Sequence, residues 1–157
     1  MRQLFSVMAL LLAVTLSAAA GNPPPLPMTT VVIDTERGPV TFTCEVAADS
    51  ASQERGLMFR KTMAPNAGML FDFHQSDTVS FWMKNTILPL DMVFIRQDGT
   101  ISSVAPNAVP YSLTPIPSAE PVRAVLEING GRAAALGIDP DERVHNAIFG
   151  DALKGQR

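Results

Sequence analysis

The sequence contains a single cysteine, so the chain can form no internal disulfide, and its stability must come from packing. That residue, Cys44, alternates with Val40, Phe42 and Val46 along a strand-like segment. Free cysteine is among the most buried residue types. We therefore expect Cys44 to be a buried thiol that packs in the core and not a reactive one.

Familiar catalytic signatures are also missing, since the sequence has no His-Glu-x-x-His, no Gly-x-Ser-x-Gly, no phosphate-binding loop and no Cys-x-x-Cys. Positive charge is scarce: 12 lysines and arginines face 15 acidic residues, for a net charge of -3. Binding to nucleic acid requires a basic face, so it is not expected here. The two histidines, His74 and His145, have no local partner at ligand spacing. We expect no metal site and no cofactor.

Only one long apolar run is present, at the N-terminus. Leu4–Leu16 follows Arg2 and spans 13 residues, too few to cross a hydrocarbon core of roughly 30 Å. Ala18 and Ala20 then fit an A-x-A cleavage site. Residues 1–20 are therefore predicted to be a signal peptide, with an uncleaved anchor as the alternative. The mature protein would be periplasmic or extracellular, with no membrane span after removal of the signal.

The rest of the chain has the length of one domain. Residues 21–28 contain four prolines and are predicted to form an extended tether. Residues 29–150 are predicted to form a single β domain, followed by a frayed tail at 151–157. We expect the protein to be a monomer.

Alternation of apolar and polar residues predicts about eight short strands, at 29–35, 40–47, 69–73, 78–83, 90–96, 100–105, 122–128 and 143–149. Two short helices are expected at 51–57, with Ser50 as its N-cap, and at 132–136. The proline-rich segment 106–121 is predicted to be a long loop at the rim of the site. Many short strands separated by turn residues favour a mainly β fold, an antiparallel jelly-roll-like sandwich or small barrel.

Five strings combine apolar and polar residues in a distinctive order: Glu54–Arg60, Gly68–Phe71, Phe81–Thr86, Pro89–Asp91 and Leu126–Gly131. In this order and spacing the chain resembles the domain-of-unknown-function family 192, over about residues 31 to 144. The Phe-Trp-Met-Lys-Asn-Thr string is the most specific part of the resemblance.

The resemblance implies a compact, mostly β fold of the jelly-roll or small-barrel kind, often exported in bacteria, and it implies no activity. One position departs from the family pattern, because Asp141 stands where a turn glycine is usual. Aspartate tolerates the left-handed backbone region better than most residues, so we expect this turn to survive.

The polar residues of these strings are the candidate functional residues. In a structural interpretation, they form two ion pairs that fix loops, Lys84 with Asp91 and Arg55 with Glu127. In a functional interpretation, they line a pocket that has an apolar wall and a few convergent polar groups. The predicted ligand-binding residues are Arg55, Trp82, Lys84, Asn85, Thr86 and Asp91.

The predicted function is binding of a small or extended extracytoplasmic ligand, and an exposed Trp82 beside charged and amide groups would suit a saccharide. An alternative is a hydrolase or another enzyme that uses Lys84, Asp91 and Glu127, the two acids acting as a carboxylate pair. A second alternative is a structural envelope protein that docks a partner.

Five methionines lie in the middle of the chain: Met58, Met63, Met69, Met83 and Met92. They could bind Cu(I) through their thioether sulfur atoms or fill gaps in the core, and we favour the core.

Overall fold

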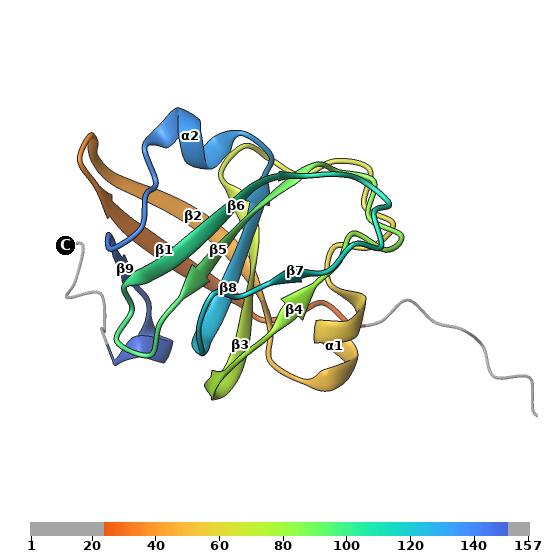
Figure 1. The fold of residues 1–157 in the computed structure, drawn as a ribbon, viewed down its shortest axis with the longest axis horizontal. Helices are drawn as coiled ribbons and strands as arrows, with labels where there is room; N and C mark the ends of the chain where they lie inside the picture. The colour runs from red at the N-terminus through yellow and green to blue at the C-terminus, as the bar shows by residue number, and fades with distance from the viewer. Residues whose placement is uncertain (1–23, 151–157) are drawn as a thin grey trace, which may run out of the picture.

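The computed structural model describes residues 24–150, which form one curled β-sheet, a small second sheet and two short α-helices (Figure 1). The predicted signal peptide and C-terminal tail lie outside the described residues, as does the start of the tether. The elements in chain order are β1 (Met28–Thr35), β2 (Gly38–Ala47), α1 (Ser50–Arg55), β3 (Ala67–Asp77), β4 (Ser80–Phe81), β5 (Leu90–Ile95), β6 (Ile101–Ala108), β7 (Ile116–Pro117), β8 (Val122–Asn129), α2 (Arg132–Leu136), β9 (Arg143–His145) and the 3-10 helix η1 (Ala147–Phe149).

The main sheet has seven strands in the order β6-β5-β8-β3-β2-β1-β9, and β4 pairs with β7 in the second sheet. This arrangement confirms the mainly β prediction. Neighbouring strands are antiparallel except for β2 and β3, which run parallel because the connection between them passes through α1. The structure has one strand more than the sequence predicts within residues 24–150. The proline-rich segment 106–121 is not one long loop, since it completes β6 and contains β7.

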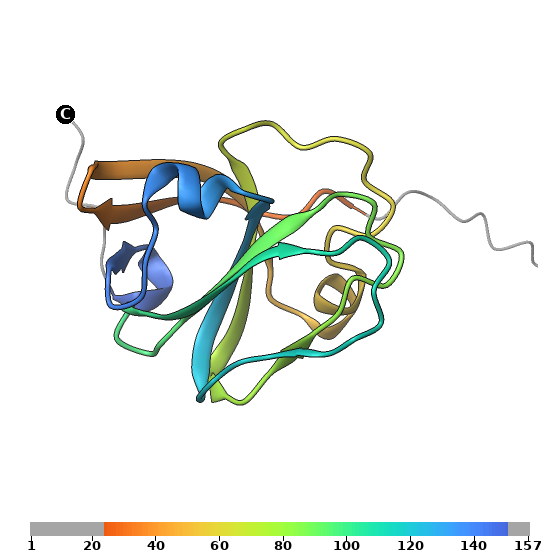
Figure 2. The ribbon, with the colours of Figure 1, turned by 45° about the horizontal axis from the view of Figure 1, so that its top comes forward.

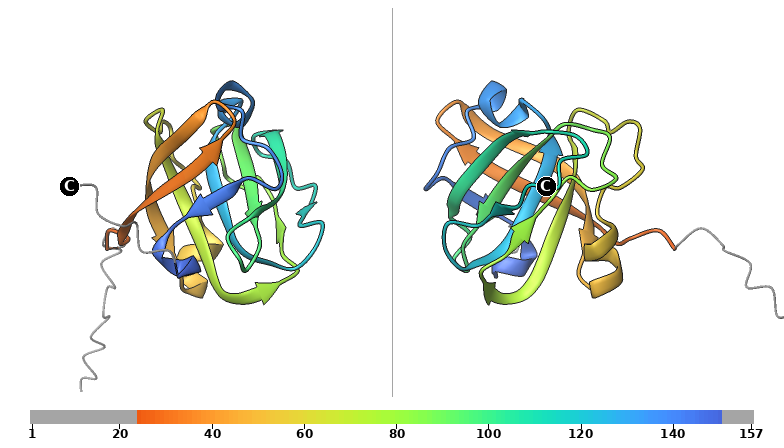
Figure 3. Two further views of the ribbon diagram at one scale, coloured as in Figure 1. Left: turned by 90° about the vertical axis from the view of Figure 1, so that its left-hand side faces the viewer. Right: turned by 45° about the vertical axis from the view of Figure 1, so that its right-hand side comes forward.

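The main sheet curls so that its two edges approach each other (Figures 2 and 3). Thr100, just before β6, forms a bridge with Arg143 of β9. Beside this bridge, the backbone N–H of Val144 donates to the carbonyl oxygen of Gly99 at 2.8 Å. These contacts join the edges at one end and give the sheet the shape of a half-barrel.

Alternation along the strands gives the sheet two apolar faces. On β8, Leu126 and Ile128 belong to one core cluster, which also contains Cys44 and residues of α2. Val125 belongs to a second cluster on the opposite face, which α1 and the β4–β7 sheet cover. Cys44 is completely buried, and this burial raises the pKa of its thiol to about 12. The prediction that Cys44 is a buried core thiol is confirmed.

The start of the first helix differs from the prediction by one residue. Asp49 is the N-cap: its carboxylate accepts the backbone N–H of Ser52 at 3.0 Å, and the Ser52 hydroxyl accepts the N–H of Asp49 at 3.2 Å. Ser50, predicted as the cap, is the first helical residue. The error arises because two overlapping segments, 49–52 and 50–53, both fit the capping pattern.

Two other local predictions are confirmed, whereas the strand predicted at 78–83 is only Ser80–Phe81, the helix predicted at 51–57 ends at Arg55, and the last strand is shorter than expected. The helix at 132–136 has the predicted bounds and ends at Gly137 in the left-handed region, with φ of 70°. Asp141 also takes a left-handed conformation, with φ of 69°, so the turn survives without glycine. Residues 143–149 do not form one strand, because the Asn146 side chain accepts the N–H of Ile148 and starts η1. No helix among residues 24–150 is long and apolar enough to cross a membrane.

Candidate functional site

A cavity of about 670 Å³ lies between α1, β4 and the sheet face that carries Val125. Four of the six predicted binding residues line it: Arg55, Trp82, Lys84 and Thr86. Its other lining residues are Gln53, Glu54, Gly56, Leu57, Met58, Phe71, Phe73, Val79, Ser80, Phe81 and Glu127. The predicted residues Asn85 and Asp91 are not among them.

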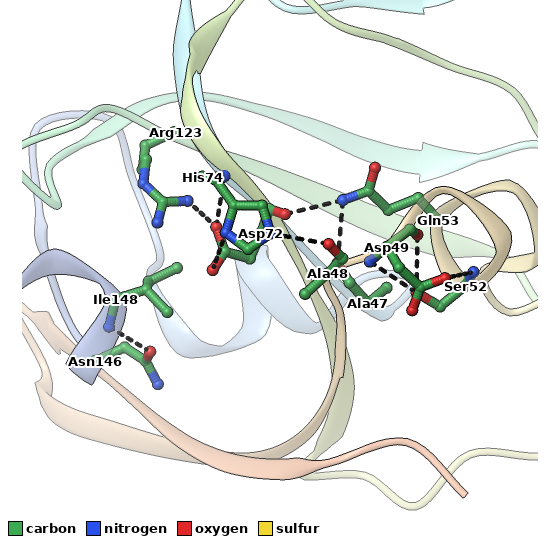
Figure 4. Close-up of polar contacts among 10 residues, drawn as sticks. All are labelled: Ala47, Ala48, Asp49, Ser52, Gln53, Asp72, His74, Arg123, Asn146 and Ile148. Atoms are coloured by element: carbon green, nitrogen blue, oxygen red, sulfur yellow. Dashed lines mark hydrogen bonds and ion pairs between the residues drawn. The ribbon is translucent and has the colours of Figure 1, made fainter. Parts of the chain in front are cut away.

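A group of hydrogen bonds fixes α1 beside the cavity (Figure 4). The Gln53 amide donates to the backbone oxygens of Asp72 in β3, at 2.8 Å, and of Ala47 in β2, at 3.3 Å. Asp72 in turn forms a buried ion pair with Arg123 of β8 and accepts the backbone N–H of His74 at 2.8 Å. The helix that provides part of the cavity wall is thus tied to β2 and β3, and the Asp72–Arg123 ion pair joins β3 to β8.

Two cations stand at the rim of the cavity. Lys84 is exposed, and its ammonium lies 5.0 Å from the centroid of the Trp82 ring, which is 50% exposed. This distance allows a cation–π contact. Arg55 is exposed in the last turn of α1. Neither cation forms a salt bridge with a residue that the structure describes, so both charges are available to a ligand.

Thr86 and Asn85 support the loop that carries Lys84. Thr86 is buried, and its hydroxyl donates to the backbone oxygen of Lys84 at 3.2 Å. Asn85 has a positive φ of 55°, and its carbonyl oxygen accepts the N–H of Phe59 at 2.9 Å. Its amide points to the sulfur of Met58 at 3.8 Å. Asn85 therefore joins two loops beside the cavity and contributes no group to its lining.

Asp91 is completely buried and does not pair with Lys84. Its carboxylate accepts three backbone N–H groups, from Asn107 at 2.8 Å, Gly131 at 2.9 Å and Ala133 at 2.8 Å. The predicted Lys84–Asp91 ion pair is wrong. Asp91 instead fixes the start of α2 and a bend in β6.

The strand register also separates the two acids of the predicted carboxylate pair. Asp91 lies opposite Ile128, whereas Met92 lies opposite Glu127. Successive side chains of a strand point to opposite faces, so Asp91 and Glu127 project from opposite faces of the sheet. They cannot flank one substrate as the acid and base of a hydrolase.

Glu127 is the residue that the predicted binding set omits. Its side chain lines the cavity, the residue is only 4% exposed, and neither a salt bridge to Arg55 nor any other side-chain partner is present in residues 24–150. Met69 of β3 and Met92 of β5 lie directly opposite it on the flanking strands. Burial raises the pKa of Glu127 from its usual 4.5 to about 8. The sequence feature that could have identified Glu127 is its position as the only acidic residue in the apolar segment 124–128.

The methionines pack as core residues. Met69, Met83 and Met92 are completely buried in the cluster on the cavity side of the sheet, and Met63 packs against it. Met58 lines the cavity. In the part of the chain that the structure describes, no group of three or more His, Cys, Asp and Glu residues is placed to hold a metal ion.

The family DUF192, described as uncharacterized ACR, has a sequence model that matches residues 31–146. A solved structure of a proposed transcription regulator from Sinorhizobium meliloti 1021 is 45% identical, with a TM-score of 0.78; the match covers 81% of this chain and 99% of that one. A structure of a protein of unknown function from Novosphingobium aromaticivorans DSM 12444 is 44% identical, with a TM-score of 0.75, over 82% of this chain and 94% of that one. No curated protein matches the chain.

Proposed function

Since the chain belongs to the uncharacterized family DUF192, we propose its function from the site: an exported protein that binds a small amphiphilic anion in the cavity beside α1. The observation that carries the proposal is the convergence of Arg55, Trp82, Lys84, Thr86 and the buried Glu127 on one cavity. Export rests on the N-terminal sequence pattern. The net charge of -3 does not favour a nucleic-acid-binding role of the kind that the name of one similar structure suggests.

The wall of the cavity favours a ligand with an apolar body. Phe71 and Phe73 each make an edge-to-face contact with Phe81, at ring-centroid distances of 5.0 Å and 6.4 Å. Leu57 and Val79 extend this apolar surface. A cavity of about 670 Å³ is within the range of roughly 300–1,000 Å³ that small-molecule sites occupy.

The rim favours an anionic group. Arg55 and Lys84 contribute two positive charges, and Glu54 contributes one negative charge, so the rim carries a net charge of +1. An anion between the two cations would gain charge-assisted hydrogen bonds. A neutral sugar would make no use of the rim charge and would bury hydroxyl groups against the apolar wall, so we favour an amphiphilic anion over the saccharide suggested by Trp82 alone.

The fluorescence of Trp82 provides a direct test, because it is the only tryptophan in the chain and it lines the cavity. The mature protein would be titrated with octanoate, an amphiphilic anion, and with galacturonate, an acidic sugar. We expect saturable changes with octanoate. A response to galacturonate alone would assign the site to sugars, and the absence of a saturable response to either would overturn the proposal.

A matched pair of variants places the binding in the cavity. Val79→Phe adds bulk to the cavity wall, whereas Val109→Phe makes the same change at a side chain that is 66% exposed and outside the lining. We expect Val79→Phe to weaken octanoate binding at least tenfold and Val109→Phe to leave it unchanged. Equal affinities for both variants would show that octanoate binds elsewhere.

A further inference from the structure

Glu127 is the only buried residue among the ionisable residues that line the cavity within residues 24–150. It belongs to β8, which lies between β3 and β5 in the main sheet, and it faces the same side as Val125. Arg55 and Lys84, by contrast, are exposed. The cavity lining therefore combines two exposed cations with one buried carboxyl group.

Other buried polar side chains of this protein have their own partners. Asp91 accepts three backbone N–H groups, Asp72 pairs with Arg123, and Asn146 donates to the Thr30 carbonyl oxygen at 2.7 Å. Glu127 has no such partner among the described residues. A buried acid that lines a cavity and has no protein partner, in a fold that pairs its other buried acids, is available to a group that enters the cavity.

The surroundings of Glu127 also determine what it can offer that partner. A buried carboxylate without a partner is unfavourable, so the group retains its proton, and a protonated carboxyl has one O–H donor. The raised pKa of about 8 agrees with this. The charged groups that line the same cavity are Glu54 and Arg55 of α1 and Lys84 after β4. The flanking strands β3 and β5 place methionines opposite Glu127.

We propose that Glu127 donates a hydrogen bond to an oxygen atom at the buried end of the ligand. The cavity would then select molecules with an anionic group at one end and a carbonyl or ether oxygen at the other, separated by an apolar body. This inference rests on the proposed ligand-binding function and names the ligand class of the same site. It gives Glu127 a role in specificity, whereas Arg55 and Lys84 provide charge attraction.

The test compares two probes that differ only in the buried acceptor. Octanoate and 7-oxooctanoate have the same chain length and the same carboxylate, but only the second carries a ketone oxygen, at the carbon next to its terminal methyl group. Isothermal titration calorimetry with the mature protein at pH 6.5 would measure both affinities. We expect 7-oxooctanoate to bind about five- to twentyfold more tightly, the effect of one additional hydrogen bond to a group buried in an apolar site.

Two substitutions of Glu127 separate the effect of its hydrogen-bond donor from the effect of its titration. Glu127→Gln keeps an N–H donor and removes the titration, whereas Glu127→Met keeps the length of the side chain and removes the donor. We expect Glu127→Gln to retain the preference for the ketone and Glu127→Met to lose it. In the wild type, the preference should disappear as the pH rises from 6.5 to 9.5, because the deprotonated carboxylate has no donor; in Glu127→Gln it should persist.

The possible outcomes separate this inference from the proposed function. If the wild type binds both probes with equal affinity, the role of Glu127 is overturned and ligand binding stands. If the ketone preference survives in Glu127→Met, the inference is likewise overturned. If the wild type binds neither probe, the proposed amphiphile site and this inference fail together. Thermal melting of each variant confirms that it is folded, and an infrared band of a protonated carboxyl, present in the wild type at pH 6.5 and lost in Glu127→Gln, tests the donor without any ligand.

Discussion

At the scale of single residues, the two acids Asp91 and Glu127 show that burial alone does not define a role. Both are at most 4% exposed, and they lie on adjacent strands. Asp91 is surrounded by three N–H donors that stabilise its charge, whereas Glu127 faces a cavity without a partner. The first arrangement stabilises the fold, and the second leaves a group free for recognition.

Substitutions of Asp91 and Lys84 should therefore differ sharply, although the residues are close in the sequence. Asp91→Asn replaces one acceptor oxygen with an NH2 group that meets an N–H donor, so we expect the free energy of unfolding to fall by about 2–3 kcal/mol. Lys84→Met removes an exposed charge and should change it by about 0.5 kcal/mol or less. Chemical denaturation measures both. A similar loss in the two variants would show that Lys84 also supports the fold.

Glu127 should make the protein less stable as the pH rises. Between about 4.5 and 8, folded Glu127 holds a proton that the unfolded chain has released, because its pKa is raised on folding. Each pH unit in this window therefore lowers stability by up to about 1.4 kcal/mol. Glu127→Gln has no titrating carboxyl group at this position and therefore does not lose stability in this way. Its melting temperature should exceed that of the wild type by a margin that widens from pH 5 to pH 8. A margin independent of pH would show that Glu127 is ionised in the folded protein.

At the scale of elements, the sequence predicts best the segments whose pattern is local. The strand at 40–47 and the helix at 132–136 depend on their own alternation and on Gly137, and both are present. The strand β7 has no such pattern, since Ile116 and Pro117 become a strand only by pairing with β4. Tertiary context thus creates elements that single-segment reasoning cannot find.

The corrected start of α1 leads to a prediction for neighbouring residues. Asp49→Ala removes the side chain that accepts the Ser52 N–H, so we expect it to cost about 1 kcal/mol of stability. Ser50→Ala changes an exposed residue within the helix and should be nearly neutral. Thermal denaturation distinguishes the two variants. A larger effect of Ser50→Ala would show that Ser50 is the N-cap, as predicted from the sequence.

At the scale of the whole molecule, the candidate site exists because distant segments meet. Arg55 comes from α1, Lys84 from the loop after β4, and Glu127 from β8. The sequence identified these polar residues as candidates for a functional site, but it did not reveal which of them lie on the same face of the sheet. The register of β5 against β8 decides that question, since it sends Asp91 to one side and Glu127 to the other.

Closure of the half-barrel depends on a close approach at Gly99. A Cβ atom there would lie 2.9 Å from the carbonyl oxygen of Val144, and the φ of 87° already disfavours a side chain. Gly38 has a φ of 106° but open space around it. We expect Gly38→Ala to lower the free energy of unfolding by about 1 kcal/mol and Gly99→Ala by about 2 kcal/mol or more. Chemical denaturation measures both losses of stability. Equal losses would show that the close approach between Gly99 and Val144 adds no steric cost.

The place of β8 in the chain has a consequence for the order of folding. It is the eighth of nine strands within residues 24–150, yet it is the strand that pairs with both β3 and β5. In a nascent chain that ends before residue 122, the strands of the main sheet fall into two separate groups, β1–β3 and β5–β6, with no shared partner between them. Pairings between distant segments form slowly. For a chain that is exported as proposed, synthesis would be nearly complete before the main sheet could assemble.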